Sequence, residues 1–370
     1  MKTGVIGPFP PYRGGIAQFS MRLLETLISG FPEHDFVPVS YRRLYPSILF
    51  PGTSQLEPDK NTVHDNTQRL IDSCNPFNWM SSRNYLSHSG FDSLIVQWWH
   101  PFFAPALLAS IPRSIPRTAV CHNVIPHESF PFAGKLSRNF LNSMDLVVVH
   151  SETDFQAAET LDLNAGLLKL YHPLYDQYNN PEVTRENSRK KLGYSEKARL
   201  VLFFGLIRSY KGVLDLVRSM NFLPDNISLL IAGECYSDRH EITSSISSLN
   251  LTSRIRWIDK FVPDSDVATY FNAADVVALP YRSASQSGVA QIALSFGKVL
   301  VLTDTGGLAE LVDQGSTGVL AQAWSPSSIA ESILTAFELQ SNPETKYRIR
   351  AKASSFSWEA YVEKLMEKIQ

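Results

Sequence analysis

Two basic side chains, Arg208 and Lys211, lie three residues apart in the segment GLIRSYKG, residues 205–212. The segment follows an apolar run and precedes a helical pattern, so we expect a loop at the carboxyl end of a strand. A guanidinium group and an ammonium group placed together are suited to bind a diphosphate. Without a wider pattern around it, such a pair is more often a solvated basic turn.

A glycine pair, Gly14 and Gly15, occupies the equivalent place near the start of the chain, in the segment PFPPYRGG, residues 8–15. Glycine allows the backbone to approach a ligand closely, and the free amides at a helix N-terminus attract anions. The segment contains neither the dinucleotide fingerprint Gly-x-Gly-x-x-Gly nor a Walker motif. The pair therefore fits either an anion-binding loop or a tight turn that starts a helix.

His122 follows the apolar run of residues 118–121 and begins the segment HNVIPHE. We expect it at the carboxyl end of a strand, where a histidine can position a hydroxyl or a sugar. A core histidine with satisfied hydrogen bonds is an equal alternative. His127 and Glu128 follow Pro126, and we expect them to point away from His122.

Hydroxyls and glycines also follow two later apolar runs. The segment SASQSG, residues 283–288, leads into a helical pattern, so Ser287 and Gly288 are predicted to hold an anion at a helix start. The segment DTGGLAE, residues 304–310, places Glu310 at the next helix, where a carboxylate commonly complements the helix dipole. The chain has no His-Glu-x-x-His motif and no carboxylate-rich loop, so we expect no metal site.

These segments all follow short apolar runs that alternate with longer amphipathic stretches, which predicts parallel strands with helices on both faces. The segment YHPLYDQYNN, residues 171–180, lacks periodicity and divides the pattern into two α/β halves near residue 175. Residues 357–370 have the apolar spacing of an amphipathic helix. The runs predicted as strands are residues 5–6, 36–39, 94–97, 118–121, 146–150, 199–204, 227–232, 255–258, 276–279 and 299–303.

Composition excludes several classes of protein. A chain of 370 residues allows two domains, and its 44% hydrophobic and 19% charged residues exclude a largely disordered or fibrous chain. Lys and Arg total 34 against 36 Asp and Glu, so the net charge of -2 gives no support to a nucleic-acid partner. The three cysteines are far apart and predict reduced thiols. The first residues predict a strand rather than a signal peptide, and no apolar run approaches about 18 residues, so we expect a cytoplasmic chain without a membrane span.

Taken in order, the segments resemble the retaining GT-B glycosyltransferases, the bacterial nucleotide-sugar-dependent group related to glycogen and mannosyl transferases. The resemblance covers nearly the whole chain. It implies two Rossmann-like α/β/α domains that face a central cleft, residues 1–172 on the acceptor side and residues 173–350 on the nucleotide-sugar side. Residues 351–370 would form a helix that packs back on the first domain. The matching segments are PYRGGIAQFS, HNVIPHE, DLVVVHS, GLIRSYKG, IAGE, FNAADVVALPY and GKVLVLTDTGGLAELV, with a tryptophan-bearing last helix.

The resemblance also implies an activity and roles for residues. The enzyme would move a sugar from a nucleotide diphosphate sugar to the hydroxyl of a glycan or lipid-linked acceptor, with retention, without a metal and in the cytoplasm. Arg208 and Lys211 would neutralise the leaving diphosphate and His122 would face the transferred sugar, so these three are the implied catalytic residues. The implied donor-binding residues are Gly14, Gly15, Gly205, Phe261, Ser287, Gly288 and Glu310.

The chain departs from the family pattern at one point. The two glutamates that the family usually carries, eight residues apart, fall here on Ala284 and Ile292. The donor, the way its ribose and sugar are held, the acceptor and the oligomeric state are therefore left open. A non-catalytic binding subunit and a nucleotide-sugar epimerase of the same fold are the alternatives, although an epimerase should have more acid–base carboxylates than the sequence offers.

Two aromatic-rich segments in the first half could receive an acceptor. Residues 42–52, RRLYPSILFPG, combine two arginines with apolar side chains, and residues 98–103, WWHPFF, add aromatic rings. This combination fits an acceptor with an apolar and an anionic part, such as a lipid diphosphate at a membrane surface. Packing of the same residues under a long loop fits equally well. We expect weak, reversible contact with the inner face of the membrane through residues 42–50.

Overall fold

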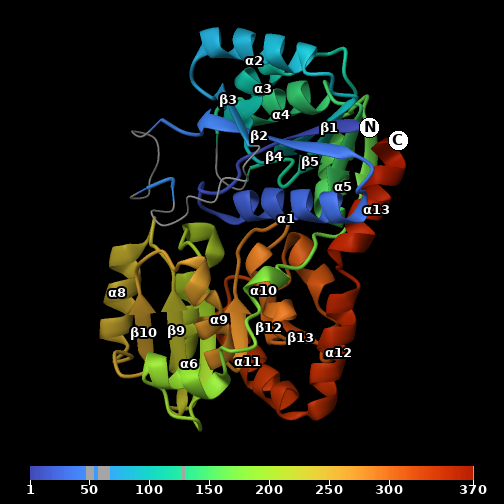
Figure 1. The fold of residues 1–370 in the computed structure, drawn as a ribbon. Helices are drawn as coiled ribbons and strands as arrows, with labels where there is room; N and C mark the ends of the chain where they lie inside the picture. Colours follow the sequence, from blue (N-terminus) through green and yellow to red (C-terminus); the bar gives the residue numbers. More distant parts are fainter. Residues whose placement is uncertain (47–53, 57–66, 127–129, 370) are drawn as a thin grey trace. The chain divides into compact units, whose positions relative to one another are not determined.

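The structure is a computed structural model of the chain, and it describes residues 1–46, 54–56, 67–126 and 130–369. The chain forms two compact units (Figure 1). The first unit contains Met1–Tyr171 and Trp358–Gln370, and the second contains His172–Ser357. Both are built on parallel sheets with helices on either side, which confirms the predicted α/β class.

The first unit has a seven-stranded parallel sheet of order β3-β2-β1-β4-β5-β6-β7. Helices α2, α3 and α4 lie on one face, and α1, α5 and α13 lie on the other (Figure 1). The strands are β1 Lys2–Ile6, β2 Asp35–Arg43, β3 Gln68–Asp72, β4 Ser93–Trp98, β5 Arg117–Cys121, β6 Leu146–Val149 and β7 Gly166–Lys169. The helices are α1 Gly15–Gly30, α2 Pro76–His88, η2 Pro101–Phe103, α3 Ala104–Ser110, α4 Ala133–Leu141, α5 Glu152–Thr160 and α13 Trp358–Ile369.

The second unit has a six-stranded parallel sheet of order β10-β9-β8-β11-β12-β13. Its strands are β8 Arg199–Phe204, β9 Ile227–Ala232, β10 Ile255–Ile258, β11 Val276–Leu279, β12 Val299–Thr303 and β13 Gly318–Ala321. Its α-helices are α6 Arg185–Leu192, α7 Val213–Ser219, α8 Arg239–Ser248, α9 Asp264–Ala273, α10 Gly288–Ser295, α11 Pro326–Ser341 and α12 Pro343–Ser354. Its 3-10 helices are η3 Asp176–Tyr178, η4 Ser209–Lys211, η5 Met220–Phe222 and η6 Gly306–Leu311.

The central strands are apolar along their whole length because helices cover both faces of the sheet. In β8, with the sequence RLVLFF, every residue after Arg199 is buried. Strands that are buried on both faces need no polar alternation, so they appear in the sequence as continuous apolar runs. The five runs predicted as strands in the second half coincide with β8 to β12, and for the central strands β8, β11 and β12 this burial is the reason.

The last helix, α13, belongs to the first unit. Its buried side chains include Trp358 and Tyr361. The Trp358 ring lies 5.0 Å from the ring of Phe19 in α1, and the Tyr361 hydroxyl hydrogen-bonds His150 Nε2 at 3.0 Å. Phe356, two residues before the helix, is buried and belongs to the second unit, as does Leu174, whose amide donates a hydrogen bond to the carbonyl of Phe356. The returning segment therefore begins at Trp358 rather than at residue 351.

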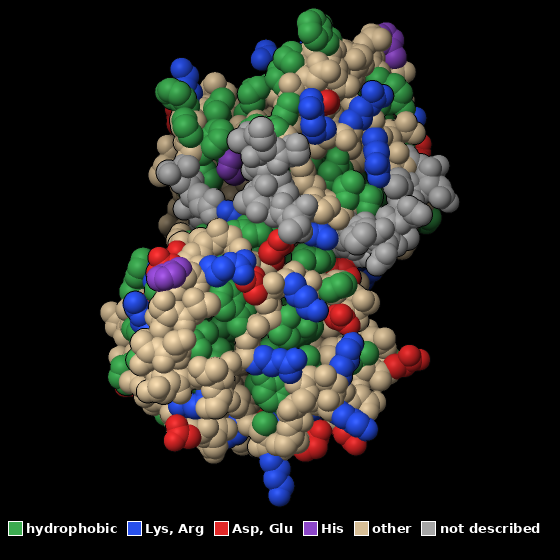
Figure 2. Space-filling model, turned by 90° about the vertical axis from the view of Figure 1, so that its left-hand side faces the viewer, with side chains coloured by type: hydrophobic (Ala, Val, Ile, Leu, Met, Phe, Trp, Pro, Cys, Tyr) green, Lys and Arg blue, Asp and Glu red, His purple; other side chains and the backbone are tan. Residues whose placement is uncertain are grey.

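Charged side chains of both signs lie interspersed on the face that Figure 2 presents, in keeping with the net charge of -2. Over the described residues, no helix combines the length and the apolar character that crossing a membrane requires.

Candidate functional site

The strand order of the second sheet reverses between β8 and β11, which are neighbours in space. Open parallel sheets bind ligands beyond the carboxyl ends of their strands, at this type of reversal. Residues 205–212 follow β8, and residues 280–287 follow β11. These two loops are therefore the first place to look for a site. They hold four of the predicted residues, and a fifth, Gly288, begins α10.

The two loops are in direct contact. The amide of Arg282 donates to the carbonyl of Tyr210 at 2.6 Å. Gly212 has φ of +66°, and a Cβ added there would lie 2.0 Å from the carbonyl oxygen of Pro280. Only glycine permits this approach, because any side chain would collide with backbone that cannot move aside. Gly212 therefore lets the β8 loop close against the β11 loop.

Each predicted cation lies over an aromatic ring from a neighbouring strand. The guanidinium carbon of Arg208 is 5.2 Å from the ring centroid of Tyr236, which follows β9. The Nζ of Lys211 is 5.5 Å from the ring centroid of Tyr281, which follows β11. Contacts of this kind are attractive because the ring face is electronegative. The rings of two flanking strands thus help to hold both cations at the carboxyl edge of the sheet.

The electrostatic environment of Arg208 and Lys211 favours binding of an anion. Burial, together with the positive charge of Arg208, lowers the pKa of Lys211 to about 8. Both causes penalise the charged lysine when no anion is present. An anion beside both cations would remove the repulsion between them and raise the pKa of Lys211 again. The arrangement therefore favours a doubly charged ligand such as a diphosphate.

The predicted anion cradle at the start of α10 adjoins this pair through Tyr281. Ser287 caps the helix, its Oγ accepting from the amide of Ala290 at 3.3 Å. The same hydroxyl donates to the hydroxyl oxygen of Tyr281 at 3.5 Å. At Gly288, an added Cβ would lie 2.9 Å from the Tyr175 ring, so this ring packs against the helix start. Lys211 and Ser287 thus both contact Tyr281.

The remaining donor-side residues are distributed along the same edge. At Gly205, the site of an added Cβ lies 3.5 Å from Lys211 Nζ, so these two residues are adjacent. Phe261 is partly buried and follows β10, two strands away from β8. Glu310 is partly buried in the 3-10 helix η6. The helix that follows β12 is thus a 3-10 helix, and the role of Glu310 in donor binding stays a prediction.

The two positions where the family usually has glutamates hold apolar side chains that are buried in the structure. Ala284 is 4% exposed and Ile292 is 7% exposed. Neither can supply a hydrogen bond to a sugar or a ribose from its side chain.

In the first unit, Gly14 and Gly15 are exposed at the start of α1. Gly14 is the N-cap with φ of +106° and has no side chain to act as a capping group. The loop follows β1, beside the reversal of strand order between β1 and β4. The glycine pair thus starts a helix, and binding of an anion there stays a prediction.

His122 is 3% exposed and lies at the carboxyl end of β5. Its Nε2 donates to the Oε1 of Gln97 at 2.8 Å, and its ring meets the ring of Phe19 edge-on at 4.7 Å. The structure thus gives Nε2 a buried protein partner, and contact with the transferred sugar stays a prediction. Gln97 was not predicted as the partner of His122. Its signal in the sequence is a polar residue at the end of the apolar run 94–97, where it can bond to a residue at the end of the neighbouring strand.

The segment WWHPFF packs inside the first unit. Trp98 and Phe103 are fully buried, and the indole nitrogen of Trp99 donates to the hydroxyl of Tyr45 at 3.0 Å. The packing interpretation is therefore correct for residues 98–103. Residues 47–50 of the segment 42–50 lie outside the described residues, as do His127 and Glu128.

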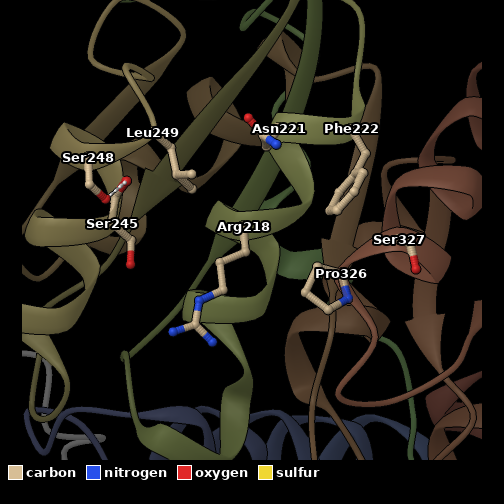
Figure 3. A pocket seen from close by; sticks show the side chains of 8 residues that line it. All are labelled: Arg218, Asn221, Phe222, Ser245, Ser248, Leu249, Pro326 and Ser327. Atoms are coloured by element: carbon tan, nitrogen blue, oxygen red, sulfur yellow. Dashed lines mark hydrogen bonds between the residues drawn. The ribbon is translucent and has the colours of Figure 1, made fainter.

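Two further features bear on the site. Within residues 1–46, 54–56, 67–126 and 130–369, no group of three or more His, Cys, Asp or Glu side chains could hold a metal ion. A pocket of about 480 Å³ lies among η5, α8 and α11, and none of the predicted site residues lines it (Figure 3). Its lining residues are Arg218, Asn221, Phe222, Ser245, Ser248, Leu249, Pro326 and Ser327.

Comparison with known families identifies the second unit. Residues 184–355 match the family model described as Glycosyl transferases group 1. This range holds Arg208, Lys211 and the start of α10, all at the reversal of strand order. The chain carries a group 1 glycosyltransferase domain.

Relatives of this glycosyltransferase domain include proteins named D-inositol 3-phosphate glycosyltransferase. The one from Corynebacterium glutamicum (strain R) is 29% identical over 242 residues, which cover 62% of this chain and 55% of the relative. The one from Corynebacterium efficiens is 31% identical over 240 residues, which cover 62% of this chain and 54% of the relative. The matched region thus spans about half the length of these curated relatives.

Solved structures extend the similarity to both units. Sucrose-phosphate synthase from Thermosynechococcus elongatus aligns over 100% of this chain and 98% of its own, with a TM-score of 0.77 and 17% identity. The Anabaena protein Alr3699/HepE in complex with UDP-glucose aligns over 100% of this chain and 99% of its own, with a TM-score of 0.76 and 15% identity. The predicted GT-B fold is therefore confirmed for the chain.

Proposed function

We propose that the chain is a glycosyltransferase that moves a sugar from a nucleoside diphosphate sugar to an acceptor hydroxyl, with retention at the anomeric carbon. One observation carries the proposal. Arg208 and Lys211 lie on the loop after β8, at the reversal of strand order, beside the N-terminus of α10. Two fixed cations and a helix start form a site for a diphosphate.

The chemistry assigned to this site is departure of the diphosphate. The bond between the anomeric carbon and the phosphate oxygen breaks, and the acceptor oxygen bonds to the same carbon. Negative charge grows on the leaving phosphate in the transition state. Preorganised cations stabilise that charge without reorganising, which lowers the barrier. Arg208 and Lys211 are assigned this role, so the reaction is proposed to need no metal ion.

The donor is proposed to be a nucleoside diphosphate sugar because the site offers features for its diphosphate. The similar protein HepE has been crystallised with UDP-glucose, which is in keeping with this class. Neutral side chains at 284 and 292 mean that ribose and sugar are held differently from the family's glutamate pair. The identity of the base and sugar is left for experiment.

We assign the acceptor to the first unit and propose that it has an apolar part. Helix α2 presents Phe77 and Met80 to solvent, 90% and 67% exposed. Large apolar side chains at this level of exposure are suited to contact a lipid surface. Arg43 is paired with Asp72 at 2.8 Å, so its charge is already offset. The membrane contact is therefore proposed to involve α2 as well as residues 42–50, on the cytoplasmic side.

The proposal is tested by screening nucleoside diphosphate sugars that differ in base and in sugar. A donor that binds the folded chain at about 100 times its dissociation constant should add about 2.7 kcal/mol to the free energy of unfolding. The donor found in this way is then incubated with candidate acceptors, and the anomeric configuration of the product is read by NMR. A chain that no nucleotide sugar stabilises, or a product with inverted configuration, contradicts the proposal.

A further inference from the structure

We infer that Arg282 is a positioning residue for the loop of residues 205–212. It sets the spacing of Arg208 and Lys211, and these two residues, not Arg282, bind the donor. This inference rests on the proposed function, because it concerns the loop that is proposed to hold the diphosphate.

Arg282 bonds to the loop at two successive carbonyls. Its amide donates to the carbonyl of Tyr210 at 2.6 Å, and its Nη1 donates to the carbonyl of Ser209 at 3.3 Å. Both carbonyls belong to η4, the short 3-10 helix that begins after Arg208 and ends at Lys211. Since η4 fixes how far apart Arg208 and Lys211 stand, Arg282 holds the turn that sets their separation.

The guanidinium of Arg282 is itself fixed by Asp215. Its Nε lies 2.8 Å from Oδ2 and its Nη2 lies 3.0 Å from Oδ1, so the pair is bidentate. The Asp215 side chain is 5% exposed. Asp215 belongs to the first turn of α7, which begins directly after the loop. A bidentate pair defines direction as well as distance, so it anchors the β11 loop to the far end of the β8 loop.

Two neighbours complete the arrangement. The ring of Trp324 lies over the guanidinium, with its centroid 3.8 Å from the central carbon of Arg282. The hydroxyl of Thr305, in the loop after β12, donates to the carbonyl of Arg282 at 3.5 Å. Arg282 therefore links the loops that follow β8, β11 and β12. Trp324 shields its ion pair from water on one side, although the indole itself is 64% exposed.

The ion pair of Asp215 and Arg282 has no net charge, so a positional effect on the site can be distinguished from an electrostatic one. Asp215 offsets the charge of Arg282, so the pair adds no net charge to the diphosphate site. Its effect on an anion must therefore come from the position it gives to Arg208 and Lys211. The double variant Asp215→Asn/Arg282→Gln keeps the net charge unchanged and leaves no buried carboxylate without its partner.

The experiment compares the dissociation constants of a nucleoside diphosphate and of the monophosphate with the same base, by calorimetry. The parent should bind the diphosphate more tightly. In Asp215→Asn/Arg282→Gln the preference should fall by about tenfold, the size of one well-placed charge contact, while monophosphate affinity stays within about twofold. Arg282→Lys keeps the pair with Asp215 but loses the fork, so its preference should lie between the two.

A control pair with the same residue types, but with a fully exposed aspartate, lies at the opposite ends of the strands of this sheet. Arg254 pairs with Asp225 at 3.2 Å and donates to the carbonyls of Leu223 and Pro224 at 3.1 and 2.7 Å. These residues lie at the amino ends of β9 and β10, away from the predicted loops. Asp225→Asn/Arg254→Gln should lower thermal stability while the diphosphate preference remains that of the parent.

Each outcome has a meaning. A folded Asp215→Asn/Arg282→Gln variant that keeps the full preference overturns the inference and leaves the proposed function intact. An equal loss in the Arg254 control also overturns it, because the effect is then general destabilisation. A parent without any diphosphate preference overturns the proposed function together with the inference. If the double variant does not fold, Arg282→Lys decides the question, and an unchanged preference there overturns the inference.

Discussion

Two opposing effects act on the pKa of Lys211, and together they determine how the site should respond to pH. Burial and the charge of Arg208 lower its pKa to about 8, whereas a bound diphosphate would raise it. The lysine is therefore mostly charged at neutral pH and mostly neutral well above pH 8. Its usefulness as a diphosphate ligand must depend on pH within an accessible range.

The first prediction concerns this pH dependence. Diphosphate affinity should fall as the pH rises from 7 to 9.5, because the lysine loses its proton above its pKa of about 8. Because the bound anion raises that pKa, binding at pH 8.5 should take up protons, which calorimetry detects in buffers of different ionisation enthalpy. In Lys211→Arg the charge persists, so the decline should disappear. Equal affinity of the parent at pH 7 and 9.5 would contradict this assignment.

Some residues of the site could not be predicted from the sequence alone. Arg208 and Lys211 were predicted because they follow an apolar run three residues apart. Tyr236 and Tyr281 were missed because they belong to other loops, and only the strand order brings them over the two cations. Contacts of this type depend on which strands are neighbours, and residue spacing within one segment does not contain that information.

At the scale of elements, the burial of a strand affects whether it can be predicted from the sequence. Strands β8 to β12 were predicted with their observed bounds because apolar residues predominate in each, even in the edge strand β10, IRWI. The edge strands β3, β7 and β13 were missed. Strand β3 is covered less completely and its sequence, QRLID, is mixed, with only Ile71 buried. The sequence predicted a helix after β12 without its type, and the structure has the 3-10 helix η6 there.

A second prediction tests the contact between the β8 and β11 loops. Gly212→Ala should cost more than about 1 kcal/mol of stability and weaken diphosphate binding, since its Cβ would lie 2.0 Å from the Pro280 carbonyl oxygen. Gly297→Ala is the control. Gly297 has a similar φ of +63°, and no described heavy atom lies within 4 Å of an added Cβ. It should cost only the strain of the backbone, about 1 kcal/mol, and leave binding unchanged. Similar effects of both variants would contradict close packing of the loops.

A third prediction concerns helix α2. If this helix contacts lipid, Phe77→Ser/Met80→Ser should reduce co-sedimentation of the chain with anionic liposomes, because both side chains are largely exposed. Tyr347→Ser is a matched control, since Tyr347 in the second unit is 74% exposed. It should leave co-sedimentation unchanged. A parent that stays in the supernatant, or a double variant that sediments like the parent, would favour a soluble acceptor instead.

At the scale of the whole molecule, the chain divides the proposed work between two units. The second unit holds the cations and the start of α10, within the group 1 glycosyltransferase domain. The first unit holds Gly14, Gly15 and His122 and is completed by α13, whose Tyr361 bonds to His150. The amphipathic pattern predicted the helix α13, and only the resemblance implied its return to the first unit, where the structure places Trp358–Gln370.

The fourth prediction concerns metal ions. Transfer activity should survive prolonged treatment with EDTA, because Arg208 and Lys211 are proposed to supply the positive charge that the leaving diphosphate needs. The measurement is the initial rate with the identified donor before and after chelation. Complete loss of activity that magnesium or manganese restores would contradict the proposal.

The central claim is that Arg208 and Lys211 stabilise the leaving diphosphate, and turnover of the single variants tests it most directly. Arg208→Ala and Lys211→Ala should each lower kcat about 100- to 1,000-fold, the cost of removing one preorganised charge contact at a developing anion. Both cations lie on a loop beyond the β8 strand end, so the thermal midpoints should stay close to that of the parent. Near-normal turnover in both variants, with folding intact, would contradict the account.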